Sequence, residues 1–138
     1  MPISVALVGF PTAIVAGGPS VTFSARLTNN SQLEAKGVAP VFQIVGGPCN
    51  CMKGALQIEG TDGRWHSVVM PEGDGANPLL SASRGIRLAP GQTASFSYRL
   101  TLSSANRPTA AQALLYAVDV AGHGQAGEAS VSTTVRAI

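Results

Sequence analysis

The clearest pattern of hydrophobic and polar positions in the chain lies at residues 93–102. Apolar or aromatic residues alternate there with Ser, Thr and Arg along the whole segment. Successive side chains of a strand point to opposite faces, so this pattern predicts a long strand with one buried and one solvated face. The preceding turn, Ala89-Pro90-Gly91-Gln92, suits such a start, because Pro presets φ and Gly accepts a positive φ. The segment therefore predicts a half-buried, antiparallel sheet.

Other short apolar segments are separated by Gly, Pro, Asn and Asp at intervals of roughly ten residues. The first is interrupted by Gly9-Phe10-Pro11, and such a split strand can pass from one sheet to another. Thr61-Asp62-Gly63 predicts a tight hairpin. A weak helical pattern occurs at residues 109–115, and residues 121–129 read as a Gly-rich connection. The expected strands are residues 4–8 continued at 12–15, 20–28, 38–45, 55–59, 64–70, 86–88, 93–102, 114–120 and 130–137.

Eight or nine short strands of this kind predict an all-β sandwich or barrel. A chain of 138 residues fits one domain, residues 1–138, and can bury a sizeable core. Alternation in the two longest strands names the expected core. It comprises Val21, Phe23, Leu27, Phe96, Tyr98, Leu100, Leu114 or Leu115, and Val131 or Val135.

The composition is unusually poor in charge. Apolar residues make up 45% of the chain and charged residues only 12%, with a formal net charge of +2. So few charges predict that a neighbour covers part of the surface. There is no basic run and only 5% of residues are aromatic, so nucleic-acid binding is not expected. No segment has the ~20 continuous apolar residues of a membrane helix, so membrane insertion is not expected.

The N-terminal segment, residues 1–10, carries no charged side chain. No Lys or Arg precedes Arg26, so we expect a retained structural strand and not a secretory signal. Both faces of this strand would be nearly apolar, so an exposed edge would invite aggregation unless a neighbour covered it. The alternative is an ordinary first strand within its own sandwich. The predicted docking residues are Ile3, Val5, Leu7, Val8 and Phe10.

The order of the segments resembles a known group of domains. An apolar strand ends in Asn, a Val-Ala-Pro-Val strand follows, and Leu88-Ala89-Pro90-Gly91-Gln92-Thr93 leads into alternating residues to Leu102. From Pro11 onward this resembles the bacterial immunoglobulin-like modules of actinobacterial surface proteins and of phage virion proteins. The resemblance implies an immunoglobulin-like antiparallel β-sandwich and transfers no catalytic residue. Trp65 does not stand between two Cys residues as it would in antibody domains.

Cys49-Asn50-Cys51 is the most unusual local motif. A disulfide between Cys49 and Cys51 would close a very short, strained ring, and two free thiols are the alternative. A zinc site would need two further ligands, for which only His66 and His123 are available, and neither the Cys nor the His residues have the usual spacing. We therefore expect no metal and no other cofactor.

Nothing in the chain assembles an acid, a base and a nucleophile. A Ser-His-Asp arrangement would need His123 and Asp119, but no Gly-x-Ser-x-Gly motif is present. Asp62 fits a role in its turn, His66 a surface or interfacial position, and Asn29-Asn30-Ser31 is a formal glycosylation motif. We therefore expect a protein that is not an enzyme.

Three functional classes were compared. The first is a structural decoration protein on a phage capsid or tail, at the virion surface, bound to a shell or capsid protein or to copies of itself. The second is a secreted or cell-wall-associated adhesion module, extracellular, from a bacterium whose GC-rich genome would explain why Lys36 and Lys53 are the only lysines. The third, a small enzyme or carbohydrate-binding module, would need clustered carboxylates or an exposed aromatic platform, and the chain has one Trp and two Tyr. The first is preferred.

Overall fold

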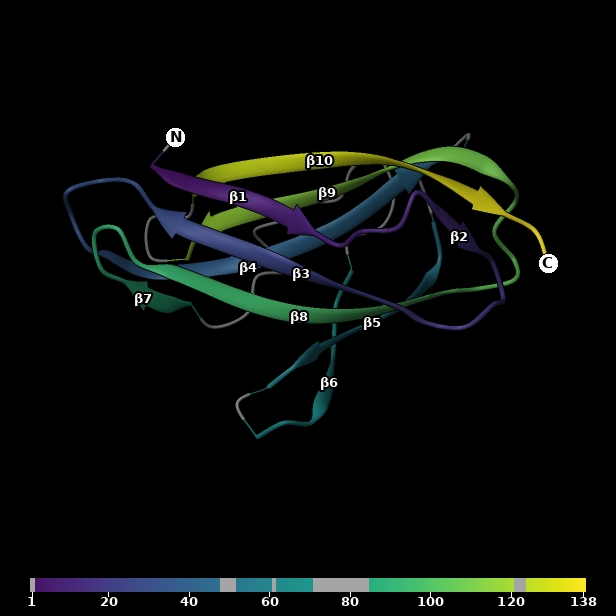
Figure 1. Ribbon diagram of the computed structural model, residues 1–138, viewed down its shortest axis with the longest axis horizontal. Coiled ribbons are helices and arrows are strands. Elements are labelled where there is room, and N and C mark those ends of the chain that lie inside the picture. The colour runs from purple at the N-terminus through teal and green to yellow at the C-terminus, as the bar shows by residue number, and fades with distance from the viewer. Residues whose placement is uncertain (1, 48–51, 61, 71–84, 121–123) are drawn as a thin grey trace.

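The computed structural model describes residues 2–47, 52–60, 62–70, 85–120 and 124–138. Within these ranges the chain forms ten strands and no helix, arranged as two five-stranded sheets that pack into a sandwich (Figure 1). The predicted all-β sandwich is therefore correct, and the predicted count of eight or nine strands is too low. The first sheet has the order β1 (Ile3–Val8), β3 (Val21–Asn29), β8 (Thr93–Leu102), β5 (Gly54–Glu59) and β6 (Trp65–Val68). The second has the order β2 (Ala13–Val15), β10 (Gly124–Arg136), β9 (Thr109–Asp119), β4 (Ala35–Gly46) and β7 (Ile86–Leu88).

The N-terminal strand is divided between the sheets, as its interrupted sequence predicted. β1 pairs with β3, and after Gly9, which has a φ of 75°, the chain crosses to the second sheet as β2. β2 then runs parallel to β10, with Ile14 opposite Val135. The expectation of a wholly antiparallel sandwich is thus wrong at this edge. The chain changes sheet here without a hairpin, which would have reversed its direction.

Strands β9 and β10 both begin well before the positions that the sequence predicted. Residues 109–113, with their weak helical pattern, form the start of β9, and residues 124–129 form the start of β10. Alanines favour helices in isolation, but β9 is paired on both sides, and Ala111, Ala113 and Ala117 are buried. Pairing and burial outweigh a propensity difference of less than ~1 kcal/mol per residue.

An aromatic cluster fills the centre of the sandwich. The ring centroids of Phe23 and Phe42 lie 4.8 Å apart, those of Phe10 and Phe23 4.9 Å, and those of Phe23 and Tyr98 5.4 Å. Of the predicted core, Val21, Phe96, Leu114 and Val131 are only partly buried. The predicted core residues that are buried are Phe23, Leu27, Tyr98, Leu100, Leu115 and Val135.

Gly127 is expected to be sensitive to substitution, because β10 approaches β1 closely at this residue. The β9–β10 pairing shifts register between Gln125 and Gly127, and a Cβ built on Gly127 would lie 2.2 Å from the carbonyl oxygen of Ile3. We expect Gly127→Ala to lower the free energy of unfolding by ~1–3 kcal/mol, because the backbone must move apart. A Cβ on Gly124 would meet nothing within 4 Å, so Gly124→Ala is the matched control. Urea denaturation of both variants tests this, and equal stabilities would contradict the close packing.

Candidate functional site

The predicted docking segment lies mostly within the molecule's own core. Ile3 is 3% exposed, Val5 and Leu7 are partly buried against the core, and Phe10 belongs to the aromatic cluster. Only Val8, 38% exposed, turns its side chain outward. The structure thus places four of the five side chains where an ordinary first strand would have them. What β1 offers to a partner is its backbone edge and its outer face.

The backbone of β1 has no ladder partner on one side beyond Ile3, where β10 passes close to the strand. The N–H of Asn30 donates to the carbonyl oxygen of Pro2 at 2.9 Å, and the β1–β3 register is unbroken from there to Val8. Because hydrogen-bonded pairs alternate along an antiparallel ladder, the N–H and C=O groups of Val5 and Leu7 point away from β3. β1 is the last strand of its sheet, so among the described strands these groups have no ladder partner.

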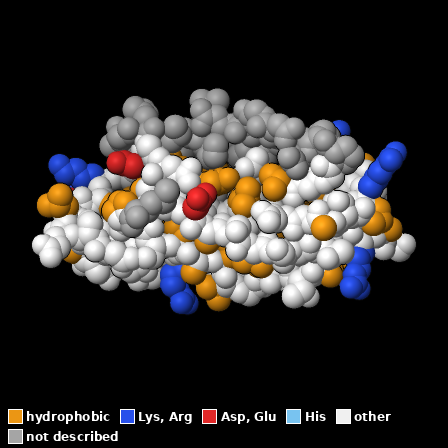
Figure 2. All heavy atoms as spheres, turned by 90° about the horizontal axis from the view of Figure 1, so that it is seen from above, with side chains coloured by type: hydrophobic (Ala, Val, Ile, Leu, Met, Phe, Trp, Pro, Cys, Tyr) orange, Lys and Arg blue, Asp and Glu red, His pale blue; other side chains and the backbone are white. Residues whose placement is uncertain are grey.

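This edge lacks the usual protection of an exposed strand. Natural edge strands carry charges, prolines or bulges that prevent pairing with another chain. The side chains of β1 on the outer face of the sheet are those of Ser4, Ala6 and Val8, none of them charged. Figure 2, which views the molecule from above Figure 1, where β1 and β10 lie, shows hydrophobic side chains along the middle with acidic side chains among them, and Lys and Arg towards the periphery.

A second surface, which we call the Trp65 groove, crosses the outer face of the same sheet. It is shallow, with a volume of about 420 Å³. The guanidinium of Arg99 lies over the Trp65 ring, 4.6 Å from its centroid, and the Arg99 Nε–H donates to Oε1 of Gln57 at 2.8 Å. The groove is lined by Val8, Gly9, Thr22, Phe23, Ser24, Glu59, Trp65 and Ser97. Sequence reasoning missed it because its residues come from five separate segments.

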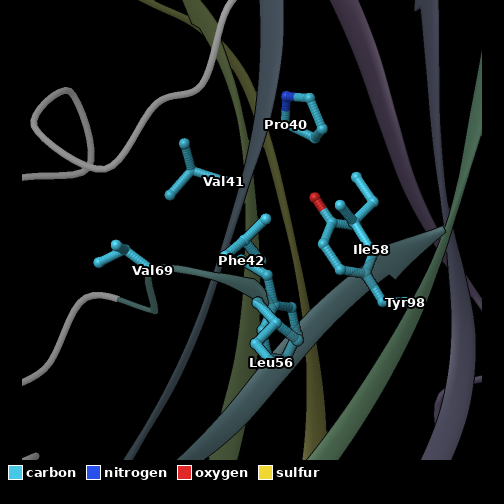
Figure 3. A pocket seen from close by; sticks show the side chains of 8 residues that line it. Pro40, Val41, Phe42, Leu56, Ile58, Val69 and Tyr98 are labelled. Carbon is cyan, nitrogen blue, oxygen red and sulfur yellow. The ribbon is translucent and has the colours of Figure 1, made fainter. Parts of the chain in front are cut away.

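The interior cavity is too small for an organic substrate. It lies between the sheets beside Tyr98 and Phe42 and has a volume of about 20 Å³, room for one water (Figure 3). Burial raises the pKa of the Tyr98 hydroxyl well above its usual value, so this group stays protonated at neutral pH. Figure 3 shows the Tyr98 hydroxyl near Pro40, among aliphatic side chains. Ligand pockets are typically ~300–1,000 Å³, so this cavity is a packing feature.

A hollow of about 170 Å³ at one end of the sandwich is lined in part by Asn29. The Asn29 side chain is fully buried; its amide donates to the carbonyl oxygens of Leu33 at 2.8 Å and Leu88 at 2.9 Å. Its Oδ1 accepts from both the backbone N–H and the hydroxyl of Ser31, each at 2.9 Å. The glycosylation motif is therefore a structural clamp, since a buried and fully bonded amide cannot carry a glycan.

The predicted turn role of Asp62 is correct. Its Oδ1 accepts from the backbone N–H of Arg64 at 2.9 Å, and both carboxylate oxygens lie 3.0 Å from Nε2 of His66. The hydrogen bond from Arg64, followed by that from His66, holds the pKa of Asp62 below its usual value. Both side chains are at least half exposed, so this pair stabilises a surface hairpin.

The remaining chemical candidates give no site within the described residues. The possible disulfide residues Cys49 and Cys51, and also His123, lie outside those residues. No three His, Cys, Asp or Glu side chains gather to hold a metal ion in the described part of the chain. No helix there is long and apolar enough to cross a membrane.

No protein-family model matches the chain, and no curated protein matches it. Among solved structures, the chain is similar to the one described as "AvmM Catalyzes Macrocyclization in Alchivemycin A Biosynthesis", with a TM-score of 0.69 and 14% identity. The alignment covers 98% of this chain and 89% of that one. At this identity the likeness supports the sandwich fold alone.

Two further solved structures are more distant. A conjugative transposon lipoprotein from Bacteroides eggerthii has a TM-score of 0.49 at 13% identity, with 96% of each chain covered. The PapD-like domain 7 of human CEP192 has a TM-score of 0.40 at 12% identity, with 97% of this chain and 84% of that one covered. Neither is close enough to carry an argument.

Proposed function

We propose that the protein is a non-enzymatic structural and interaction protein: an immunoglobulin-like sandwich that works as a bound subunit on the surface of a phage capsid or tail. Its partner is a shell or capsid protein, or further copies of itself. The observation that carries the proposal is the uncharged backbone edge of β1 beyond Ile3, which no described strand pairs with in a ladder. Strand addition at such an edge supplies main-chain hydrogen bonds and removes the aggregation hazard that the edge poses.

The immunoglobulin-like assignment rests on the two-sheet sandwich and on the first strand being divided between the sheets. The low charge of the chain, 12% of residues, supports a surface that is partly covered in the working state. The virion location rests on the resemblance described above.

Catalysis is disfavoured by the geometry of the described residues. The interior cavity holds about one water, and the exposed His66 is paired with a turn aspartate without a nucleophile beside the pair. The solved structure with the 0.69 TM-score, which is named for a macrocyclization, is only 14% identical, so the likeness supports the fold alone. We therefore do not extend that activity to this chain.

Fractionation of the source bacterium's culture after prophage induction tests the location. We expect the protein in density-purified phage particles, at a fixed copy number relative to the major shell protein by quantitative mass spectrometry. Recovery from the culture medium or cell wall, with none in particles, would replace the proposal by the alternative of a secreted or wall-associated adhesion module.

A further inference from the structure

The Trp65 groove has the chemistry of a saccharide site. Trp65 and Glu59 both line it, and they are neighbours because they face each other in the β5–β6 ladder. The hydroxyls of Ser24 and Ser97, which are opposite each other on β3 and β8, line the same groove. The site thus combines an aromatic surface with a carboxylate acceptor and hydroxyl groups that both donate and accept hydrogen bonds.

The aromatic wall is held in place before any ligand arrives. Arg99 lies across one side of the Trp65 ring and is itself fixed by its hydrogen bond to Gln57 on the neighbouring strand. Trp65 is half-buried at the outermost strand of the sheet, and it lines the groove. Preorganising a side chain in this way lowers the entropy cost of binding, so Arg99 is a positioning residue for Trp65.

The residues of the groove select the class of ligand. Glu59 alone is charged among the described residues that line the groove, and the cationic Arg99 lies over Trp65, so the local charge is balanced. A sugar ring presents C–H groups on its faces and hydroxyls around its rim, which match an indole wall and a hydroxyl-lined floor. A volume of about 420 Å³ accommodates a short oligosaccharide.

We propose that the Trp65 groove binds a neutral glycan through Trp65, Glu59, Ser24 and Ser97. This inference does not depend on the virion location, since a sheet face that binds sugar can serve a decoration protein or an adhesion module. The groove reaches β1 at Val8 and Gly9, whereas strand addition would use the backbone groups of Val5 and Leu7 that point away from β3.

The single Trp of the chain makes the test specific, because all tryptophan fluorescence comes from Trp65. The purified protein is titrated with short neutral oligosaccharides of glucose, galactose, mannose and N-acetylglucosamine. We expect a saturable change in emission with at least one of them, and binding of the same sugar by calorimetry. No change in emission and no heat with any sugar would overturn the proposal.

Variants locate the site. We expect Trp65→Ala and Glu59→Ala each to weaken binding by roughly tenfold or more, a loss of about 1.4 kcal/mol. Glu59 is exposed, so its variant remains informative if the loss of the Trp65–Arg99 contact destabilises the other. Thr93→Ala, on the same face but outside the groove, should bind as the unmodified protein does. Unchanged affinity in both groove variants would show that the sugar binds elsewhere and would overturn the proposal. Tryptophan emission that responds to a shell protein but to no sugar would also overturn it, because the groove would then be a protein interface.

Discussion

Replacing Phe42 by Ala is expected to lower the free energy of unfolding by ~3–5 kcal/mol, a large share of the ~5–15 kcal/mol that holds a domain together. Phe42 is 1% exposed and its ring contacts those of Phe10, Phe23 and Tyr98. The substitution removes a buried ring and leaves a cavity that rings from both sheets cannot readily fill. Chemical denaturation followed by circular dichroism measures the change.

Leu33→Ala provides the control for that measurement. Leu33 is 78% exposed, so its truncation should change stability by no more than about 0.5 kcal/mol. If Phe42→Ala cost no more than Leu33→Ala, the aromatic cluster would not be the centre of the core.

The second large effect is expected at Asn29. Asn29→Leu leaves the carbonyl oxygens of Leu33 and Leu88 without the N–H groups that Asn29 donates to them. It also removes the oxygen that accepts a hydrogen bond from Ser31. A buried polar group left without its partner costs ~1–3 kcal/mol, so we expect a total loss of about 2–4 kcal/mol. The melting temperature and the unfolding free energy both report it.

The neighbouring Asn30→Ala is the matched control. Asn30 is exposed and its side chain bonds the hydroxyl of Ser4, so its truncation should cost well under 1 kcal/mol. Equal losses for Asn29→Leu and Asn30→Ala would show that Asn29 does not clamp this end of the sandwich.

The period-two pattern predicted the parts of the fold that it governs directly. Residues 93–102 form β8 with the predicted bounds, and the Gly9-Phe10-Pro11 interruption marks the change of sheet. The pattern did not predict strand residues where both faces are buried, or where the strand is built from small residues. The N-terminal part of β9 is rich in Ala, and β10 begins at a Gly-rich bulge, so neither shows clear alternation.

The candidate surfaces were only partly predictable. The uncharged N-terminal segment pointed to β1, but the sequence could not say that its apolar side chains pack inward and leave the backbone edge free. The Trp65 groove depends on strand order. Glu59 and Trp65 meet through a hairpin that the sequence predicted, whereas Ser24 and Ser97 meet through a long-range pairing that local patterns do not specify.

The central claim, that the protein works as a subunit docked through the edge of β1, is tested most directly by its occupancy on purified particles. The variant Ala6→Lys with Val8→Lys adds charge beside the edge on exposed positions, where lysine discourages strand addition. Gln112→Lys with Ser130→Lys adds the same charge at exposed positions of the second sheet. We predict that the β1 variant folds as the unmodified protein does but is lost from particles by roughly tenfold, while the control retains full occupancy. Equal occupancy of the two folded variants would contradict the claim.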